Sequence, residues 1–245
     1  MDPLPVPCLA LYEGADTPKP AVFNIFEEVE FDFGIDSLKN NKKLWNPQDS
    51  DDKIQLPHLP QDLPRECTCL LSGKPTIPGC IVLLVEPIAT VIWYCRLGED
   101  DEWMRHEYDI GTQPLLPPLD GKDHEKVPIC SIAACRGKFY LNSRLSDIGV
   151  LEFSPAPVFS SLELAGEFED LYRAKAFLVE SDDELYMVIM VYHSFKCDNT
   201  DYETRVYKMD FSEQRWNRVD DLAGRAFLLA PCKVEDGIVF LVQRK

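Results

Sequence analysis

Residues 205–219 read RVYKMDFSEQRWNRV and contain two apolar runs separated by a short polar segment. Apolar and charged residues alternate from Tyr207 to Phe211, which is the two-residue period of a half-buried β-strand. The polar residues 212–214 then turn the chain before Trp216 begins a second run. This stretch predicts a β-hairpin with one face in a core.

Two further stretches combine the same elements. In one, apolar runs at 176–179 and 186–192 flank a polar turn at 181–184. In the other, apolar runs at 81–85 and 89–95 flank a Pro-containing turn at 86–87. Their β-branched and aromatic residues suit strands that are buried on both faces. Few segments have helical periodicity, so the sequence predicts an all-β fold.

A strand that ends in an acidic or Pro-containing turn, and is followed by a second apolar strand, recurs along the chain. Four copies lie at 44–57, 93–103, 150–162 and 206–216. Their turns are marked by Pro47, Gly98, Pro155 and Phe211. These markers are spaced 51, 57 and 56 residues apart, and a period of about 50 is typical of four-stranded, kelch-type propeller blades. We therefore expect a β-propeller-like fold, with chance spacing of turns in a β-sandwich as the alternative.

At this period the 245 residues supply four or five blades, so the expected propeller is small or incomplete. Segments with Pro and Gly at 71–79 and 112–121 are expected to be loops between blades. No stretch has the composition of an interdomain linker. We therefore expect a single β-propeller-like domain over residues 1–245.

The charge of the chain argues against two classes of partner. There are 42 Asp and Glu residues against 25 Lys and Arg, and the net charge of −17 repels nucleic-acid phosphates and anionic lipid. Residues 1–7 have no basic or apolar signal region, and the apolar stretch 81–95 is too short and too interrupted to span a bilayer. We expect a cytoplasmic or nuclear protein that is not secreted and that binds neither nucleic acid nor membrane.

The nine cysteines form an odd set spread over the whole chain, which predicts reduced and mostly buried thiols. Cys67, Cys69 and Cys80 lack the paired spacing of a zinc site. Cys130 and Cys135 flank a strand-like run and are expected in the core. We expect no metal and no cofactor.

The sequence contains no phosphate-binding loop, nucleophile elbow, kinase signature or metalloprotease motif. The histidines are isolated from one another, at His58, His106, His124 and His193. The acidic pairs 100–101 and 220–221 are adjacent residues that point apart, and 49–52 lacks the glycine and distal glutamate of a calcium loop. We therefore expect no catalytic residue, and the sequence identifies no partner-binding residue.

The tryptophans stand at the repeating turns, at Trp45, Trp93, Trp103 and Trp216. Packing between adjacent blades is their expected role. The alternative is an exposed tryptophan on a propeller face that anchors a partner.

Four motifs in the same order resemble the plant F-box-associated β-propeller domain, of the kind in kink-suppressed-in-bzr-dominant type F-box proteins. They are the NP…I-LP-L blade at 44–60, the W-C…G…W blade at 92–103 with its GKFY strand at 137–140, the LVES…EL turn at 178–185, and the ending at 206–228. The resemblance covers roughly residues 40 to 230. Asp182-Asp183 stands where the family turn commonly has Gly, so a longer or reshaped hairpin is expected there.

Proteins of this family typically join the domain to an N-terminal F-box, which docks on the Skp1 adaptor of a cullin-based ubiquitin ligase while the propeller holds the substrate. No F-box segment is recognised before residue 40, and residues 7–11 are expected to begin the propeller. Part of a blade is expected to be lost between residues 33 and 43, where no strand is recognisable.

The resemblance implies a protein–protein interaction module like the substrate-binding part of an F-box ubiquitin-ligase receptor. The module would lack its own F-box, would reach Skp1 or cullin only indirectly, and would not be an enzyme. Two alternatives stay open. One is a propeller-fold hydrolase or lyase whose acid and base lie on loops. The other is a truncated family member with little activity.

Overall fold

The computed structural model is all-β, as expected, with strands and no helix among the residues that it describes. These residues are 8–11, 21–24, 29–31, 43–46, 49–58, 67–75, 77–86, 89–119, 122–166, 174–192, 202–222, 226–229 and 239–242. The chain divides into two compact units, Met1–Leu59 and Pro60–Lys245.

The first unit contains two antiparallel sheets. One has three strands, β1 (Cys8–Leu11), β2 (Ala21–Asn24) and β3 (Val29–Phe31), and the other pairs β4 (Lys43–Asn46) with β5 (Asp49–Gln55). The β4–β5 hairpin is the first of the four expected repeats. Its acidic run at 49–52 lies on strand β5, and residues 33–42 lie outside the described part.

The second unit contains three four-stranded antiparallel sheets, here called the first, second and third blades. The first is β6 (Thr68–Leu71), β7 (Ile81–Val85), β8 (Val91–Arg96) and β9 (Met104–Glu107). The second is β12 (Ile132–Cys135), β13 (Lys138–Leu141), β14 (Asp147–Phe153) and β15 (Pro157–Glu163). The third is β16 (Ala174–Ser181), β17 (Glu184–Tyr192), β18 (Tyr202–Asp210) and β19 (Arg215–Val219).

Each blade is a meander in which strands pair in chain order. The other three expected repeats are the last two strands of each blade: β8–β9, β14–β15 and β18–β19. In these three copies the repeat seen in the sequence is therefore the last two strands of a four-stranded blade, and the predicted blade architecture is confirmed.

The described part of the second unit also contains two short hairpins. β20 (Ala226–Leu229) pairs with β21 (Val239–Val242) after the third blade, and β10 (Thr112–Leu119) pairs with β11 (Lys122–Lys126) between the first and second. The expected loop at 112–121 thus lies between blades, but most of it is strand β10. Its ladder shifts register between Pro114 and Leu119, as prolines cannot donate to a sheet.

The other expected inter-blade loop, 71–79, was placed wrongly. It joins β6 to β7 inside the first blade, and the ladder continues past the strand ends because Ser72 N donates to Ile81 O at 3.0 Å. Ile81 N donates in return to Ser72 Oγ at 2.9 Å. The Pro- and Gly-containing segment is therefore a wide hairpin loop within one sheet.

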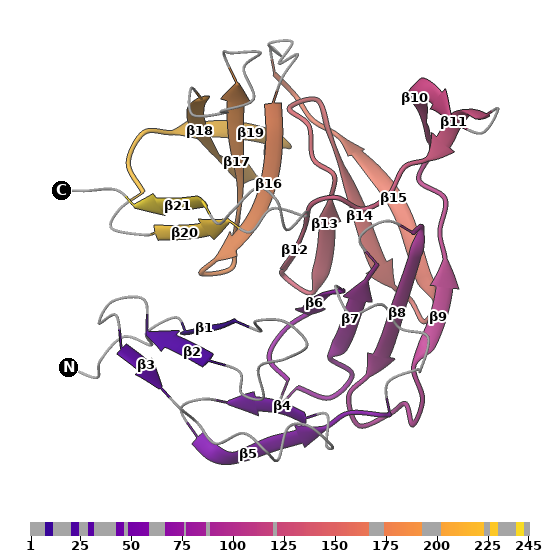
Figure 1. Ribbon diagram of the computed structural model, residues 1–245, viewed down its shortest axis with the longest axis vertical. Coiled ribbons are helices and arrows are strands. Elements are labelled where there is room, and N and C mark those ends of the chain that lie inside the picture. The colour runs from indigo at the N-terminus through magenta and orange to yellow at the C-terminus, as the bar shows by residue number, and fades with distance from the viewer. Residues whose placement is uncertain are drawn as a thin grey trace. The chain divides into compact units, whose positions relative to one another are not determined.

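Buried apolar side chains join successive blades face to face. Between the first and second blades the shared cluster includes Ile92, Tyr94, Phe139, Leu141 and Leu151. Between the second and third it includes Tyr140, Ile148, Leu185, Met187 and Met209, and beyond the third Tyr186, Val188 and Phe227 pack together. Figure 1 shows the blades side by side in this order, with β12 beside β16.

Strand β17 lies between β16 and β18 in the third blade, and its sequence is a continuous apolar run because both of its faces are buried. All six residues 185–190 are buried. Leu185 and Met187 face the second blade, whereas Tyr186 and Val188 face strand β20. The prediction that this strand is buried on both faces is confirmed.

The hairpin between β16 and β17 has a two-residue turn, because Ser181 pairs with Glu184. Both turn residues are left-handed, with φ of 57° at Asp182 and 60° at Asp183. This is the backbone of the tight turn that normally carries Gly at its second position. The expected lengthening of this hairpin is therefore wrong, since aspartate tolerates the left-handed region better than most residues do.

Replacing Asp183 by glycine is expected to raise the free energy of unfolding by about 0.5–1 kcal/mol, because glycine adopts this φ without strain. Urea unfolding of the two proteins measures the difference. Asp183→Asn removes the same charge but keeps a side chain, so it should give a smaller gain. An equal gain from both variants would assign the effect to charge.

Candidate functional site

The turn between β12 and β13 of the second blade contacts the turn between β16 and β17 of the third blade. Arg136 and Gly137 form the two-residue turn between β12 and β13, with φ of 52° and 79°. Arg136 Nε donates to the carbonyl oxygen of Asp183 at 3.0 Å, and Cys135 Sγ donates to the same oxygen at 3.5 Å. These bonds join residues 47 and 48 positions apart and fix the two turns together.

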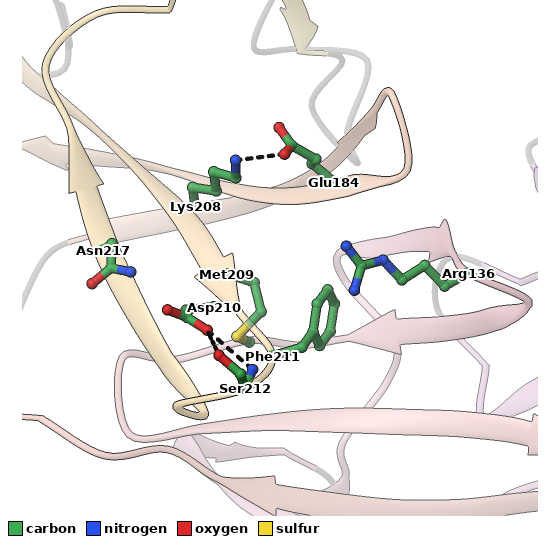
Figure 2. A pocket seen from close by; sticks show the side chains of 8 residues that line it. All are labelled: Arg136, Glu184, Lys208, Met209, Asp210, Phe211, Ser212 and Asn217. Carbon is green, nitrogen blue, oxygen red and sulfur yellow. Dashed lines mark hydrogen bonds and ion pairs between the residues drawn. The ribbon is translucent and has the colours of Figure 1, made fainter.

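A hollow of about 440 Å³ opens beside this junction. It is lined by Arg136, Glu184, Lys208, Met209, Asp210, Phe211, Ser212 and Asn217. The last pair between β17 and β18 joins Tyr186 to Lys208, so the pairing stops two residues short of the end of each strand, at Glu184 and Asp210. Figure 2 shows the lining side chains, which come from β17, β18, β19, the turn between β18 and β19, and the Arg136 turn.

The two carboxylates of the hollow are already engaged by neighbours. Lys208 Nζ donates to Glu184 Oε1 at 2.5 Å, and the Tyr186 hydroxyl donates to Glu184 Oε2 at 2.7 Å. Asp210 Oδ1 accepts the Ser212 hydroxyl at 2.6 Å and the backbone N–H groups of Ser212 and Glu213 at 3.0 and 3.1 Å. The hydrogen bond from the Ser212 hydroxyl is the largest cause that lowers the pKa of Asp210.

Arg136 lies over an aromatic ring at the edge of the hollow. Its guanidinium carbon is 4.7 Å from the centre of the Phe211 ring, within cation–π range. The Phe211 ring lies 5.4 Å from that of Tyr140, which belongs to the core shared by these blades. Figure 2 shows the guanidinium directed towards Phe211. The position of this arginine is therefore set by both blades.

A second hollow, also of about 440 Å³, lies where the chain leaves the first blade and reaches the second. Its lining includes Asp109, Arg144, Gly149 and Phe159. Asn142 also lines this hollow, but its side chain is used by the local structure, because its Oδ1 accepts from Cys130 N at 2.8 Å and its Nδ2 donates to Pro128 O at 2.7 Å. This hollow offers fewer fixed charged groups than the first.

The tryptophans differ in their environments. Trp216 joins blades as expected, since it packs on the core between the second and third and its Nε1 donates to Arg144 O at 3.2 Å. Trp93 and Trp103 are buried, and Trp93 Nε1 donates within the first blade to Glu86 Oε1 at 2.8 Å. Trp45 lies on β4.

The described histidines differ in their exposure. His58 and His124 are exposed, and the half-buried His106 ring stacks on Phe159 with their centres 6.2 Å apart. His193 lies outside the described residues. Among the residues that the structure places, no group of three or more His, Cys, Asp or Glu side chains could hold a metal ion.

The cysteine prediction is confirmed in part. Cys80, Cys95 and Cys135 are buried, but Cys69 and Cys130 are exposed, so the expected core position of Cys130 is wrong. Cys130 lies in the connection that leads to β12, and its N–H donates to Asn142 Oδ1 at the surface. A residue that flanks a buried strand need not point into the core.

Thiol reactivity tests this burial. Burial raises the pKa of the Cys95 thiol to about 12 and that of Cys135 to about 11. At pH 8, iodoacetamide should therefore alkylate the native chain at Cys130 at least about 100-fold faster than at either buried thiol, by peptide mapping. The rates should converge in denaturant, and equal rates in the native chain would contradict this packing.

No helix within the described ranges is long and apolar enough to cross a membrane.

Comparison with known proteins identifies a family. Residues 31–234 match the family model described as KIB1-4 β-propeller. The match covers more than half of the chain. No curated protein and no solved structure matches.

Proposed function

The chain belongs to the KIB1-4 β-propeller family, and on this basis we propose that its blades act as a protein–protein interaction module. The observation that carries the proposal is the junction of the second and third blades. There, exposed turns from two blades are locked together by the Arg136 and Cys135 bonds to Asp183 and border a hollow with fixed charged groups. Pre-ordered polar and aromatic groups of this kind suit recognition of a protein surface.

The geometry supports binding better than catalysis. A hydrolase or lyase would need a carboxylate or histidine with a shifted pKa that is available to a substrate. In the hollow, Glu184 is held by Lys208 and Tyr186, and the pKa of Asp210 is lowered by the turn that it caps. Both carboxylates therefore serve the local structure.

The finer proposal concerns the larger assembly. We propose that residues 1–245 act as one propeller-like domain, corresponding to the substrate-binding part of an F-box ubiquitin-ligase receptor. Skp1 and cullin would then be reached indirectly, through a partner that supplies an F-box. The net charge of −17 favours protein partners in the cytoplasm or nucleus over nucleic acid and membrane surfaces.

Affinity purification of the tagged full chain from plant cells, with mass spectrometry against a tag-only control, tests both the interaction module and its link to a ubiquitin ligase. The proposal predicts specific protein partners, and recovery of none above the control would overturn it. Recovery of Skp1 and cullin would support the ligase link. Recovery of other proteins without them would leave an interaction module and remove that link.

A further inference from the structure

Arg136 is an exposed side chain that is nevertheless held in place at three points. Its backbone is left-handed in a two-residue turn, its Nε is bonded to Asp183 O, and its guanidinium lies on the Phe211 ring. A free surface arginine loses rotamer entropy when it binds a ligand. Here the fold has already restricted the side chain, so less entropy remains to be lost.

The hydrogen-bonding capacity of this arginine is only partly used. The structure gives Nε one acceptor, and in the described part of the chain neither Nη nitrogen has one. The other charges of the hollow are engaged, since Lys208 is paired with Glu184 and Asp210 caps its own turn. The Nη groups of Arg136 are therefore charged hydrogen-bond donors at the hollow, and neither Glu184 nor Asp210 accepts a hydrogen bond from them.

We propose that this hollow binds a carboxylate side chain of a protein partner through the Nη groups of Arg136. A planar guanidinium donates two parallel bonds to a carboxylate, which gives direction as well as affinity. Asn217, at the wall of the hollow, supplies an amide that can bond the segment carrying the carboxylate. This inference rests on the proposed function, because it names the partner chemistry of the same site.

The surroundings of the hollow restrict the partner further. Asp182 and Asp183 form the turn that holds Arg136, and Glu213 follows the lining residue Ser212; all three are exposed. Together with the net charge of −17, they repel a segment that is acidic throughout. The favoured partner segment has one Asp or Glu flanked by Lys or Arg, so that its carboxylate meets Arg136 and its basic residues meet the surrounding carboxylates.

The probe is a capped pentapeptide, acetyl-Lys-Ala-Glu-Ala-Lys-amide, titrated into the isotope-labelled full chain and followed by NMR. It should shift signals of the turns at 136–137 and 211–214. The same peptide with Gln in place of Glu should bind at least tenfold more weakly, because it cannot form the charged pair. A peptide with phosphoserine in place of Glu tests the other anion, and tenfold tighter binding of it would overturn the carboxylate assignment.

Variants test the role of the guanidinium. Arg136→Gln should abolish the preference for the Glu peptide, and Arg136→Lys, which keeps the charge but not the fork, should weaken binding several-fold. Arg105→Gln is the matched control, since Arg105 is an exposed arginine on β9, paired with Glu107 at 2.7 Å. The folding of each variant is checked by its unfolding midpoint.

The inference is overturned if no peptide binds, if the Glu and Gln peptides bind equally, or if Arg136→Gln binds as the unmodified chain does. The proposed function is tested separately, by comparing the proteins that co-purify with the unmodified chain and with Arg136→Gln. Proteins that co-purify equally with the unmodified chain and with Arg136→Gln would leave the interaction module standing and remove this site. Loss of every partner from both baits would overturn the interaction module itself.

Discussion

Replacing Phe139 by alanine is expected to lower the free energy of unfolding by about 3–5 kcal/mol, which is the cost of removing a large side chain from a close-packed core. Phe139 has 0% of its surface exposed and belongs to the cluster shared by the first and second blades. Its ring stands nearly perpendicular to that of Phe153, with centres 6.0 Å apart. Denaturant unfolding followed by tryptophan fluorescence measures the loss.

Val158→Ala is the matched control for this experiment. Val158 lies on the outer strand β15 of the same blade, but it is 51% exposed. Its truncation should change the free energy of unfolding by less than about 0.5 kcal/mol. Similar losses from the two variants would contradict the account in which the blades are held together by the faces that they share.

Gly149→Val is expected to cost about 3 kcal/mol or more, because the site has no room for a side chain. A Cβ atom added at Gly149 would lie 2.7 Å from Leu141 Cδ1, 2.9 Å from its Cγ and 3.0 Å from its carbonyl oxygen. The carbonyl belongs to the β13–β14 ladder, where Leu141 pairs with Gly149, so it cannot move freely. The blade itself should lose stability in this variant.

Two comparisons identify the clash as the cause. Gly73→Ala should be nearly neutral, because nothing lies within 4 Å of the Cβ that it adds. Gly149→Ala should cost less in a Leu141→Ala background than in the unmodified chain, because two of the three close atoms are then absent. Equal costs in both backgrounds would mean that Leu141 is not the obstacle.

The hairpins could be predicted from the sequence because their information is local. In the β18–β19 hairpin, the alternation from Tyr207 to Phe211 sets which face is buried, and the polar residues after it set the turn. In β17 the continuous apolar run at 185–190 predicts burial on both faces. Pairing of neighbours in the chain then follows from the short connections.

The candidate site could not be predicted, because it depends on contacts between distant segments. Arg136 and Asp183 are 47 positions apart. The sequence indicates a turn at each place, from Gly137 and from the polar residues 181–184, but it does not say which distant turn each one meets. The loop at 71–79 was misplaced for a related reason: composition identifies a turn, but it does not say whether the turn lies within a sheet or between two.

Hydrogen exchange on the full chain, alone and with the protein that it captures most abundantly, shows whether the blade junction binds protein. The partner is expected to slow exchange at the turns of the second and third blades, residues 136–137, 182–183 and 211–214, with little change in the buried strand β17. Slowed exchange confined to other segments, with these turns unaffected, would contradict the claim that the blade junction binds protein.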